Sequence, residues 1–127
     1  MLSDYLIGTW KTYKSVIYSD GQVYNLGISK DGDVKTAYIE VTLMEDGQAL
    51  IANWQQDNEG NLVWVEVAGT YVLHGNEFTL TDQEGNKTQY VFEAQSKDIY
   101  FKDTVESEGS EMTIYVYFRK NVEISKV

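Results

Sequence analysis

Short apolar and aromatic segments alternate with polar turns along the whole chain. Glycine stands beside Asp, Glu or Asn at intervals of about ten to fifteen residues, in Asp20-Gly21, Asp31-Gly32, Asp46-Gly47, Glu59-Gly60, Gly75-Asn76, Glu84-Gly85-Asn86 and Glu108-Gly109. Glycine adopts a positive φ without steric cost, and Asp or Asn side chains bond the local backbone, so these clusters predict turns. Their spacing leaves no room for helices between strands and predicts an up-and-down meander.

The segments between the turns are rich in Tyr, Val, Ile, Thr, Phe and Trp, which pack well on a pleated surface. We therefore predict eight main strands, over residues 8–18, 35–44, 48–55, 62–73, 77–81, 87–95, 98–105 and 111–120. Residues 21–34 fit less well, because they hold only one short apolar piece between two Asp-Gly turns. They predict a long connection that carries a short strand or cap.

Alternation of apolar and polar positions within these segments predicts strands with one buried face. In the last strand, Met112, Ile114, Val116 and Phe118 share one parity. Eight such strands can form two packed sheets or close on themselves, and closure alone removes the exposed edges. The expected fold class is all-β, an antiparallel up-and-down barrel in one domain over residues 1–127, a length that suits a single core.

Composition and charge narrow the classes of function. The chain has no cysteine, which excludes disulfides, thiolate metal sites and a cysteine nucleophile. Twenty acidic residues against ten basic ones give a net charge of -10, which opposes binding to nucleic acid or to an anionic membrane surface. No apolar run is long enough to span a bilayer, and the first residues lack the pattern of a signal peptide.

Two ends of the chain carry a family resemblance. The segment Leu6-Ile7-Gly8-Thr9-Trp10 resembles the Gly-x-Trp signature that opens the first strand of lipocalins, and Val116-Tyr117-Phe118-Arg119-Lys120 resembles their terminal strand. The tracts Val67-Ala68-Gly69-Thr70-Tyr71 and Asn76-Glu77-Phe78-Thr79-Leu80 are similar to those of small bacterial lipocalin-like domains. The long connection after the first strand resembles the family's lid loop.

The resemblance implies a plug at one end of the barrel, formed by Gly8 and by Trp10 beneath Arg119. An arginine on an indole face gains about 0.5 to 2 kcal/mol, depending on desolvation. The alternative is that Trp10 is ordinary core and Arg119 an exposed charge. The resemblance also implies export to the periplasm or cell envelope, which no signal in this chain supports, so localisation stays open.

Catalytic and metal chemistry find little support. His74 is the only histidine and lies in a predicted turn, and the acidic clusters lack the spacing of a calcium loop. No Gly-x-Ser-x-Gly turn or phosphate-binding glycine loop is present. We therefore expect no enzyme, metal or cofactor. The enzymatic alternative makes Glu66 and Asp103 an acid and base pair in a pocket with Trp64 and Phe101.

Three charged residues fall on otherwise apolar parities: Lys14, Glu66 and Asp103. If these faces point inward, each charge needs a partner or water. If a strand twists or bulges there, each charge reaches solvent. The sequence leaves both alternatives open.

The leading hypothesis is a binding or carrier module for a small hydrophobic ligand, because an eight-stranded barrel has an interior sized for one such molecule. The expected lining is Trp54, Trp64, Glu66, Tyr90, Phe92, Phe101 and Asp103. The alternative is a non-enzymatic protein-interaction or envelope module with a filled barrel, suggested by outward-facing Tyr13, Tyr115 and Tyr117. Its protein partner is unknown.

Overall fold

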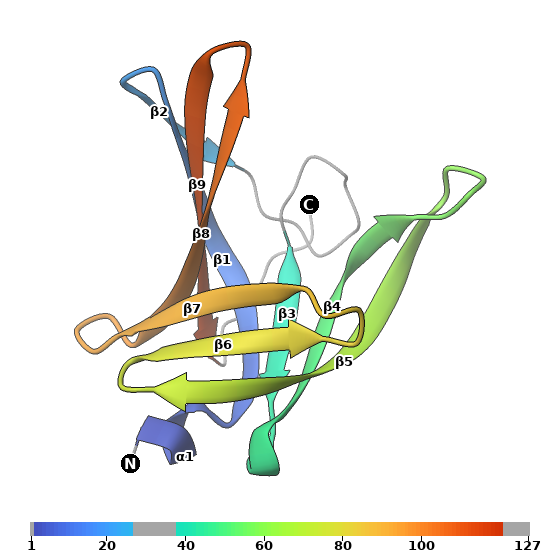
Figure 1. Ribbon diagram of the computed structural model, residues 1–127, viewed down its shortest axis with the longest axis vertical. Helices are drawn as coiled ribbons and strands as arrows, with labels where there is room; N and C mark the ends of the chain where they lie inside the picture. Colours follow the sequence, from blue (N-terminus) through green and yellow to red (C-terminus); the bar gives the residue numbers. More distant parts are fainter. Residues whose placement is uncertain (1, 27–37, 121–127) are drawn as a thin grey trace.

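The computed structural model describes residues 2–26 and 38–120, and these form one short helix and nine strands. Figure 1 shows how they are arranged. The elements are, in order, α1 (Leu2–Leu6), β1 (Gly8–Ser19), β2 (Gln22–Leu26), β3 (Ile39–Leu43), a 3-10 turn (Glu45–Gly47), β4 (Gln48–Gln56), β5 (Leu62–His74), β6 (Glu77–Asp82), β7 (Lys87–Glu93), β8 (Asp98–Ser107) and β9 (Ser110–Lys120).

Eight of the strands close into an antiparallel up-and-down barrel, which confirms the predicted fold class. Strands β3 to β9 follow each other as neighbours, and β1 pairs with β3 on one side and with β9 on the other. The ninth strand, β2, lies outside this ring and pairs with the second half of β1. It is the short strand predicted within 21–34, and the rest of that predicted lid lies outside the described residues, as do 35–37 of the second predicted strand.

Two hairpin turns show why the glycine pattern was informative. At Asp20-Gly21 and at Glu108-Gly109, both residues have positive φ, between 49° and 81°. These are the two-residue turns whose twist matches that of the flanking strands. The turns therefore fix the register of β1 with β2 and of β8 with β9, where Ser107 pairs with Ser110.

The barrel core is made by one parity of each strand except β1, in which the inward parity changes at a bulge. It includes Val41 and Leu43 from β3, Phe78 and Leu80 from β6, and Val116 and Phe118 from β9, all buried. Tyr90 of β7 stacks on Phe78 with ring centroids 4.9 Å apart and meets Phe118 at 5.8 Å. The prediction that Val116 and Phe118 share an inward face with Ile114 is thus confirmed.

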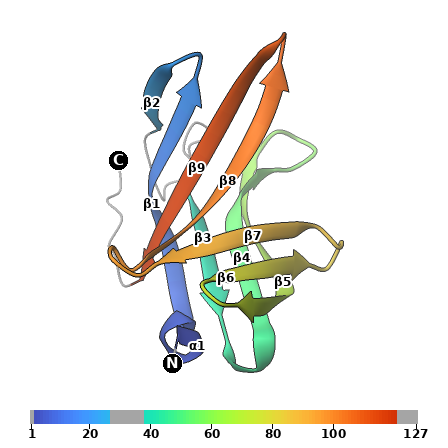
Figure 2. The ribbon, with the colours of Figure 1, turned by 60° about the vertical axis from the view of Figure 1, so that its left-hand side comes forward.

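One end of the barrel is closed by α1, visible at the bottom of Figures 1 and 2. Leu6 is fully buried, and Trp10 Nε1 donates a hydrogen bond to the Leu6 carbonyl over 2.8 Å. The Tyr5 ring meets the edges of Trp10 and Phe92. Five residues are too few to show helical periodicity, which is why the sequence did not predict this helix.

The cation over Trp10 is Lys120, so the prediction that Arg119 covers this ring is wrong. Lys120 Nζ lies 5.7 Å from the Trp10 ring centre and donates to the Tyr5 carbonyl over 2.5 Å. A Cβ on Gly8, whose φ is +134°, would lie 3.0 Å from Lys120 Cε. The register explains the correction, because Trp10 pairs with Lys120, and Arg119 therefore points to the opposite face of β9.

On the outer face, Arg119 joins β8, β9 and β1. Its Nε and Nη2 donate to the two carboxylate oxygens of buried Asp98 at 2.8 and 3.2 Å. Tyr13 donates a hydrogen bond to the same carboxylate, and the guanidinium lies 4.3 Å from the Tyr13 ring centre. A β-bulge between Thr12 and Lys14 accompanies this placement of Tyr13.

Replacing Trp10 with alanine should lower the free energy of unfolding by about 3–5 kcal/mol, because it leaves a cavity beneath α1 and removes the bond to Leu6. Urea titration of both proteins measures the loss. Trp54→Ala is the matched control and should cost less, since Trp54 is only half-buried. Equal losses would contradict the role of Trp10 as the closed end.

Replacing Tyr13 with phenylalanine should change the alkaline limb of the stability profile. Burial and the hydrogen bond to Asp98 raise the pKa of Tyr13 to about 12, so the folded state favours the neutral phenol. Its contribution is complete below a pH of about 10 and is lost as the pH rises through about 12. The difference in urea midpoint between wild type and Tyr13→Phe should shrink across this range, and a constant difference would contradict the assignment.

Candidate functional site: a cleft between β7 and β8

The barrel wall opens where β7 and β8 separate. These strands pair only at Val91 with Tyr100, Phe92 with Ile99 and Glu93 with Asp98. Beyond Tyr100, β8 stays paired with β9. Strand β7 instead turns away from β8 and stays paired with β6, as Figures 1 and 2 show. The β6–β7 and β8–β9 ladders hold the two strands in different directions, and a cleft lies between them.

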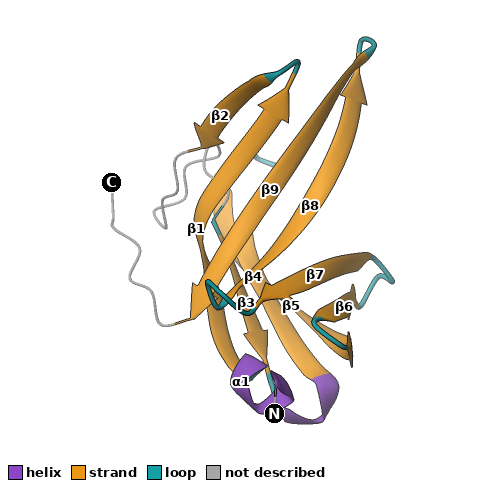
Figure 3. Ribbon diagram, turned by 90° about the vertical axis from the view of Figure 1, so that its left-hand side faces the viewer, coloured by secondary structure: helices purple, strands orange, loops and turns teal. Residues whose placement is uncertain are grey.

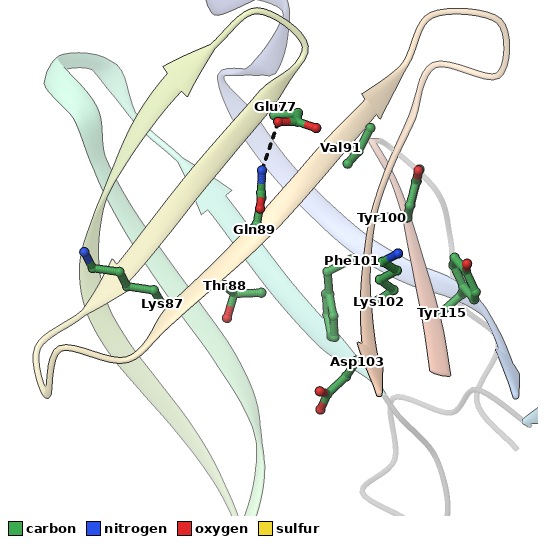
Figure 4. A pocket seen from close by; sticks show the side chains of 10 residues that line it. All are labelled: Glu77, Lys87, Thr88, Gln89, Val91, Tyr100, Phe101, Lys102, Asp103 and Tyr115. Atoms are coloured by element: carbon green, nitrogen blue, oxygen red, sulfur yellow. Dashed lines mark hydrogen bonds between the residues drawn. The ribbon is translucent and has the colours of Figure 1, made fainter. Parts of the chain in front are cut away.

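The cleft has a volume of about 520 Å³ and two kinds of wall (Figure 4). Thr88 of β7 and Phe101 and Asp103 of β8 lie on the parity that also carries the core residues Tyr90 and Ile99. The rim is formed by residues of the outer parity, namely Lys87, Gln89, Val91, Tyr100, Lys102 and Tyr115, together with Glu77 of β6. The cleft therefore leads from the outer surface to the edge of the core.

The floor of the cleft is aromatic. Phe101 packs against the core, with its ring centroid 5.5 Å from Tyr90 and 5.9 Å from Phe118. Burial raises the pKa of the Tyr90 phenol, which therefore stays neutral beneath the cleft. An apolar group entering here would find polarizable ring surface, which is the usual lining of a small-molecule site.

The rim is polar and balanced in charge. Lys87, Lys102 and Glu77 of the rim and Asp103 of the wall line the opening, and all four side chains are exposed. Gln89 Nε2 donates to Glu77 Oε2 over 2.9 Å, a contact drawn in Figure 4. The exposed charges remain hydrated, so the rim can accept either end of a dipolar or amphipathic molecule at little desolvation cost.

The structure brings together only part of the predicted ligand site. Phe101 and Asp103 line the cleft, and Tyr90 lies directly beneath it in the core. Phe92 lies instead at the closed end, with its ring centroid 5.6 Å from Tyr5 of α1. The walls also contain Thr88, Gln89 and Lys102. The sequence did not single out these residues, because the divergence of two strands leaves no signal in an alternating pattern.

The prediction that Trp54 and Trp64 line the interior is wrong. They form a cross-strand pair, with centroids 5.4 Å apart, on the face of β4 and β5 opposite the core. The core takes the other parity of β4, which begins with Ala49 and Ile51. The apolar run from Ala49 to Trp54 has similar residues on both faces, so alternation could not settle which one points inward.

Trp64 belongs to an outer aromatic cluster with Tyr38. Their rings stack with centroids 6.1 Å apart, and Tyr38 donates a hydrogen bond to Glu40 Oε2 over 3.0 Å. Burial and this hydrogen bond raise the pKa of Tyr38. Glu66, expected in the ligand site, is exposed on this same outer face, because Ala52 pairs with both Glu40 and Glu66.

The three charged residues on apolar parities have separate explanations. The bulge in β1 places Lys14 outside, with Nζ 4.6 Å from the centre of the Tyr117 ring. Glu66 points outward from β5, while Asp103 is exposed on the inward parity of β8. Since Glu66 and Asp103 occupy opposite faces of strands that are not neighbours, the structure does not assemble the acid and base pair of the enzymatic alternative.

The outer face of β8, β9 and β1 carries four tyrosines in contact, which we call the tyrosine face: Tyr18, Tyr100, Tyr115 and Tyr117. Two open grooves of about 440 and 410 Å³ lie along it. Tyr115 and Tyr117 are on the outward parity, as the sequence predicted. The tyrosine face adjoins the cleft, because Tyr100 and Tyr115 line both.

Within residues 2–26 and 38–120, no group of three or more His, Asp or Glu side chains could hold a metal ion. No helix in the same part of the chain is long and apolar enough to cross a membrane.

Comparison with known proteins gives no functional assignment. No family model matches the chain, and no curated protein matches it. Among solved structures, one similar chain is an uncharacterized protein from Bacteroides eggerthii DSM 20697, with 15% sequence identity over 90% of this chain and 98% of that one. The TM-score is 0.47, so this likeness carries no argument about function.

Proposed function

We propose that this protein is a non-enzymatic, lipocalin-like binding module for a small, mainly apolar ligand, which enters between β7 and β8. The observation that carries the proposal is the cleft of about 520 Å³ that opens onto the aromatic floor at Phe101. Small-molecule sites commonly have volumes of about 300–1,000 Å³, with apolar walls and a few polar groups. The volume of this cleft lies in that range and its floor at Phe101 is apolar, whereas the larger part of its rim is polar.

The arrangement of the walls favours a ligand with one apolar and one polar end. The apolar end would cover Phe101 and the Thr88 methyl group, where each buried CH₂ contributes about 0.8 kcal/mol. The polar end would remain at the rim beside Lys102 or Gln89, where it keeps its contact with water. Fatty acids, retinoids and bile-type sterols have this division of polarity and form the first panel for titration.

Filling the cleft should block binding. Thr88→Trp places an indole between the walls and should weaken binding of a panel ligand by about 100-fold or more, as measured by isothermal titration calorimetry. Phe101→Ala should weaken it about tenfold by removing the floor. Thr70→Trp is the matched control, since Thr70 is exposed on β5, outside the cleft, and its affinity should match that of wild type.

Two results would contradict the ligand proposal. Native mass spectrometry of protein purified without detergent should reveal a bound small molecule or, after addition, binding of a panel member. If nothing binds, or if Thr88→Trp binds as tightly as Thr70→Trp, the cleft is not the site. Amide chemical shifts at Thr88, Phe101 and Asp103 provide a second measurement that does not depend on a substitution.

The tyrosine face favours a second candidate, a protein-interaction module. Tyr18 is 46% exposed, and tyrosine is enriched where proteins meet. In this case, crosslinking in native extract should recover the same partner with wild type and lose it with Tyr18→Ser and Tyr115→Ser. Recovery of a bound small molecule with no such partner would favour the first candidate.

A further inference from the structure

The second half of β8 presents an unpaired sheet edge. Its β7 ladder ends at Tyr100, and from residue 102 to 106 β8 pairs with β9 on its other side alone among the described residues. All five of these side chains are exposed. Figure 3 shows that this part of the β8–β9 hairpin projects beyond β6 and β7. An edge of this kind carries backbone donors and acceptors that another strand can pair with.

The hairpin geometry identifies which backbone groups face outward from this edge. Ser107 pairs with Ser110 across a two-residue turn, and the pair that closes such a turn is hydrogen-bonded. Along an antiparallel strand, successive residues aim their N–H and C=O groups to alternate sides. Those of Val105 and Asp103 therefore point to β9, whereas those of Lys102, Thr104 and Glu106 point away from it.

The sequence of this edge is complementary to itself. When two copies of β8 run antiparallel about a two-fold axis through Thr104, each Lys102 lies opposite Glu106 of the other copy. In this register, the outward-facing backbone groups of Lys102, Thr104 and Glu106 meet those of the other copy. Each pair of opposite residues then forms two hydrogen bonds. Shifting the register by two residues places Lys102 opposite either Thr104 or the turn residue Glu108, and the charge match within the strands is lost.

We propose that this protein forms a homodimer by edge-to-edge pairing of β8 about Thr104. The interface is isologous, as in most dimers, so one attractive pair of Lys102 with Glu106 appears twice. Charged side chains commonly protect exposed edges from pairing. Here their order places opposite charges together when a second copy pairs antiparallel in this register. Because Lys102 and Asp103 also line the cleft, a second copy paired at this edge would compete with a ligand for the same space.

Charge reversal tests the register. Sedimentation equilibrium should show a dimer for wild type, while K102E and E106K each place like charges opposite one another twice and should raise the dimer dissociation constant about tenfold or more. The double variant K102E/E106K restores both attractions and should dimerise as wild type does. An equimolar mixture of the two single variants should form a heterodimer. Glu59→Lys, in the exposed turn between β4 and β5, is the control and should leave dimerisation unchanged.

A single introduced thiol tests the two-fold axis directly. The chain has no cysteine, so T104C brings two thiols together only where the copies meet at this residue. Directly paired residues of an antiparallel ladder have Cα atoms about 5.5 Å apart, within the range of a disulfide. Oxidation by air should link T104C into covalent dimers. T113C is the control, because Thr113 lies beside Thr104 in the interior of the hairpin's sheet.

The proposal predicts a combined pattern. A wild-type chain that sediments as a monomer at its highest soluble concentration would overturn it, provided that T104C also links no faster than T113C. A dimer that is indifferent to K102E, to E106K and to their combination would overturn it as well, because the interface would then lie elsewhere. Circular dichroism of each variant should match that of wild type, which separates loss of pairing from loss of folding.

Discussion

The pairing of the first strand with the last is the interaction on which the remaining structure depends. Without the β1–β9 ladder, the other strands would form an open sheet with two long edges and a half-covered core. The outer face secures this closure through Asp98, which accepts hydrogen bonds from Arg119 of β9 and from Tyr13 of β1. A buried carboxylate is tolerated here because a two-point arginine contact and a phenol meet its oxygens.

The bulge in β1 joins this closure to the two faces of the barrel. Before the bulge, Trp10 and Thr12 point inward, and after it the inward parity passes to Ser15. The extra residue leaves Tyr13 and Lys14 outside, where they meet Arg119 and Tyr117. One irregularity thus supplies the phenol for the Asp98 cluster and removes a lysine from the barrel interior.

The sequence predicted the parts of the fold that depend on local chemistry. Glycine turns and β-branched or aromatic segments located the eight main strands and the up-and-down order, because positive φ and pleated packing are properties of short segments. It failed where both parities are apolar, as at Trp54 and Trp64, and it left the direction of Lys14 open, because the parity changes within that strand. The cation over Trp10 was assigned to Arg119 because of the resemblance to lipocalins, whereas the register pairs Trp10 with Lys120, and a difference of one residue exchanges the faces. Phe101 and Asp103, which were predicted to contact a ligand, do line the cleft, but the divergence of β7 and β8 that forms it leaves no signal in the sequence of either strand.

That divergence gives β8 two environments within ten residues. Its first part, Asp98 to Tyr100, is held on both sides by β7 and β9 and carries the carboxylate that helps to close the barrel. Its second part keeps only β9, so one side lines a cleft above Phe101 and the edge remains unpaired. A strand bound on both sides cannot open without losing hydrogen bonds along its length, whereas one bound on a single side can present a surface at no such cost. The half of β8 that is paired on both sides therefore sets the position of the half that is paired on one side. Any molecule that binds the cleft or the edge meets a wall whose geometry is set by the Asp98, Arg119 and Tyr13 contacts at its base.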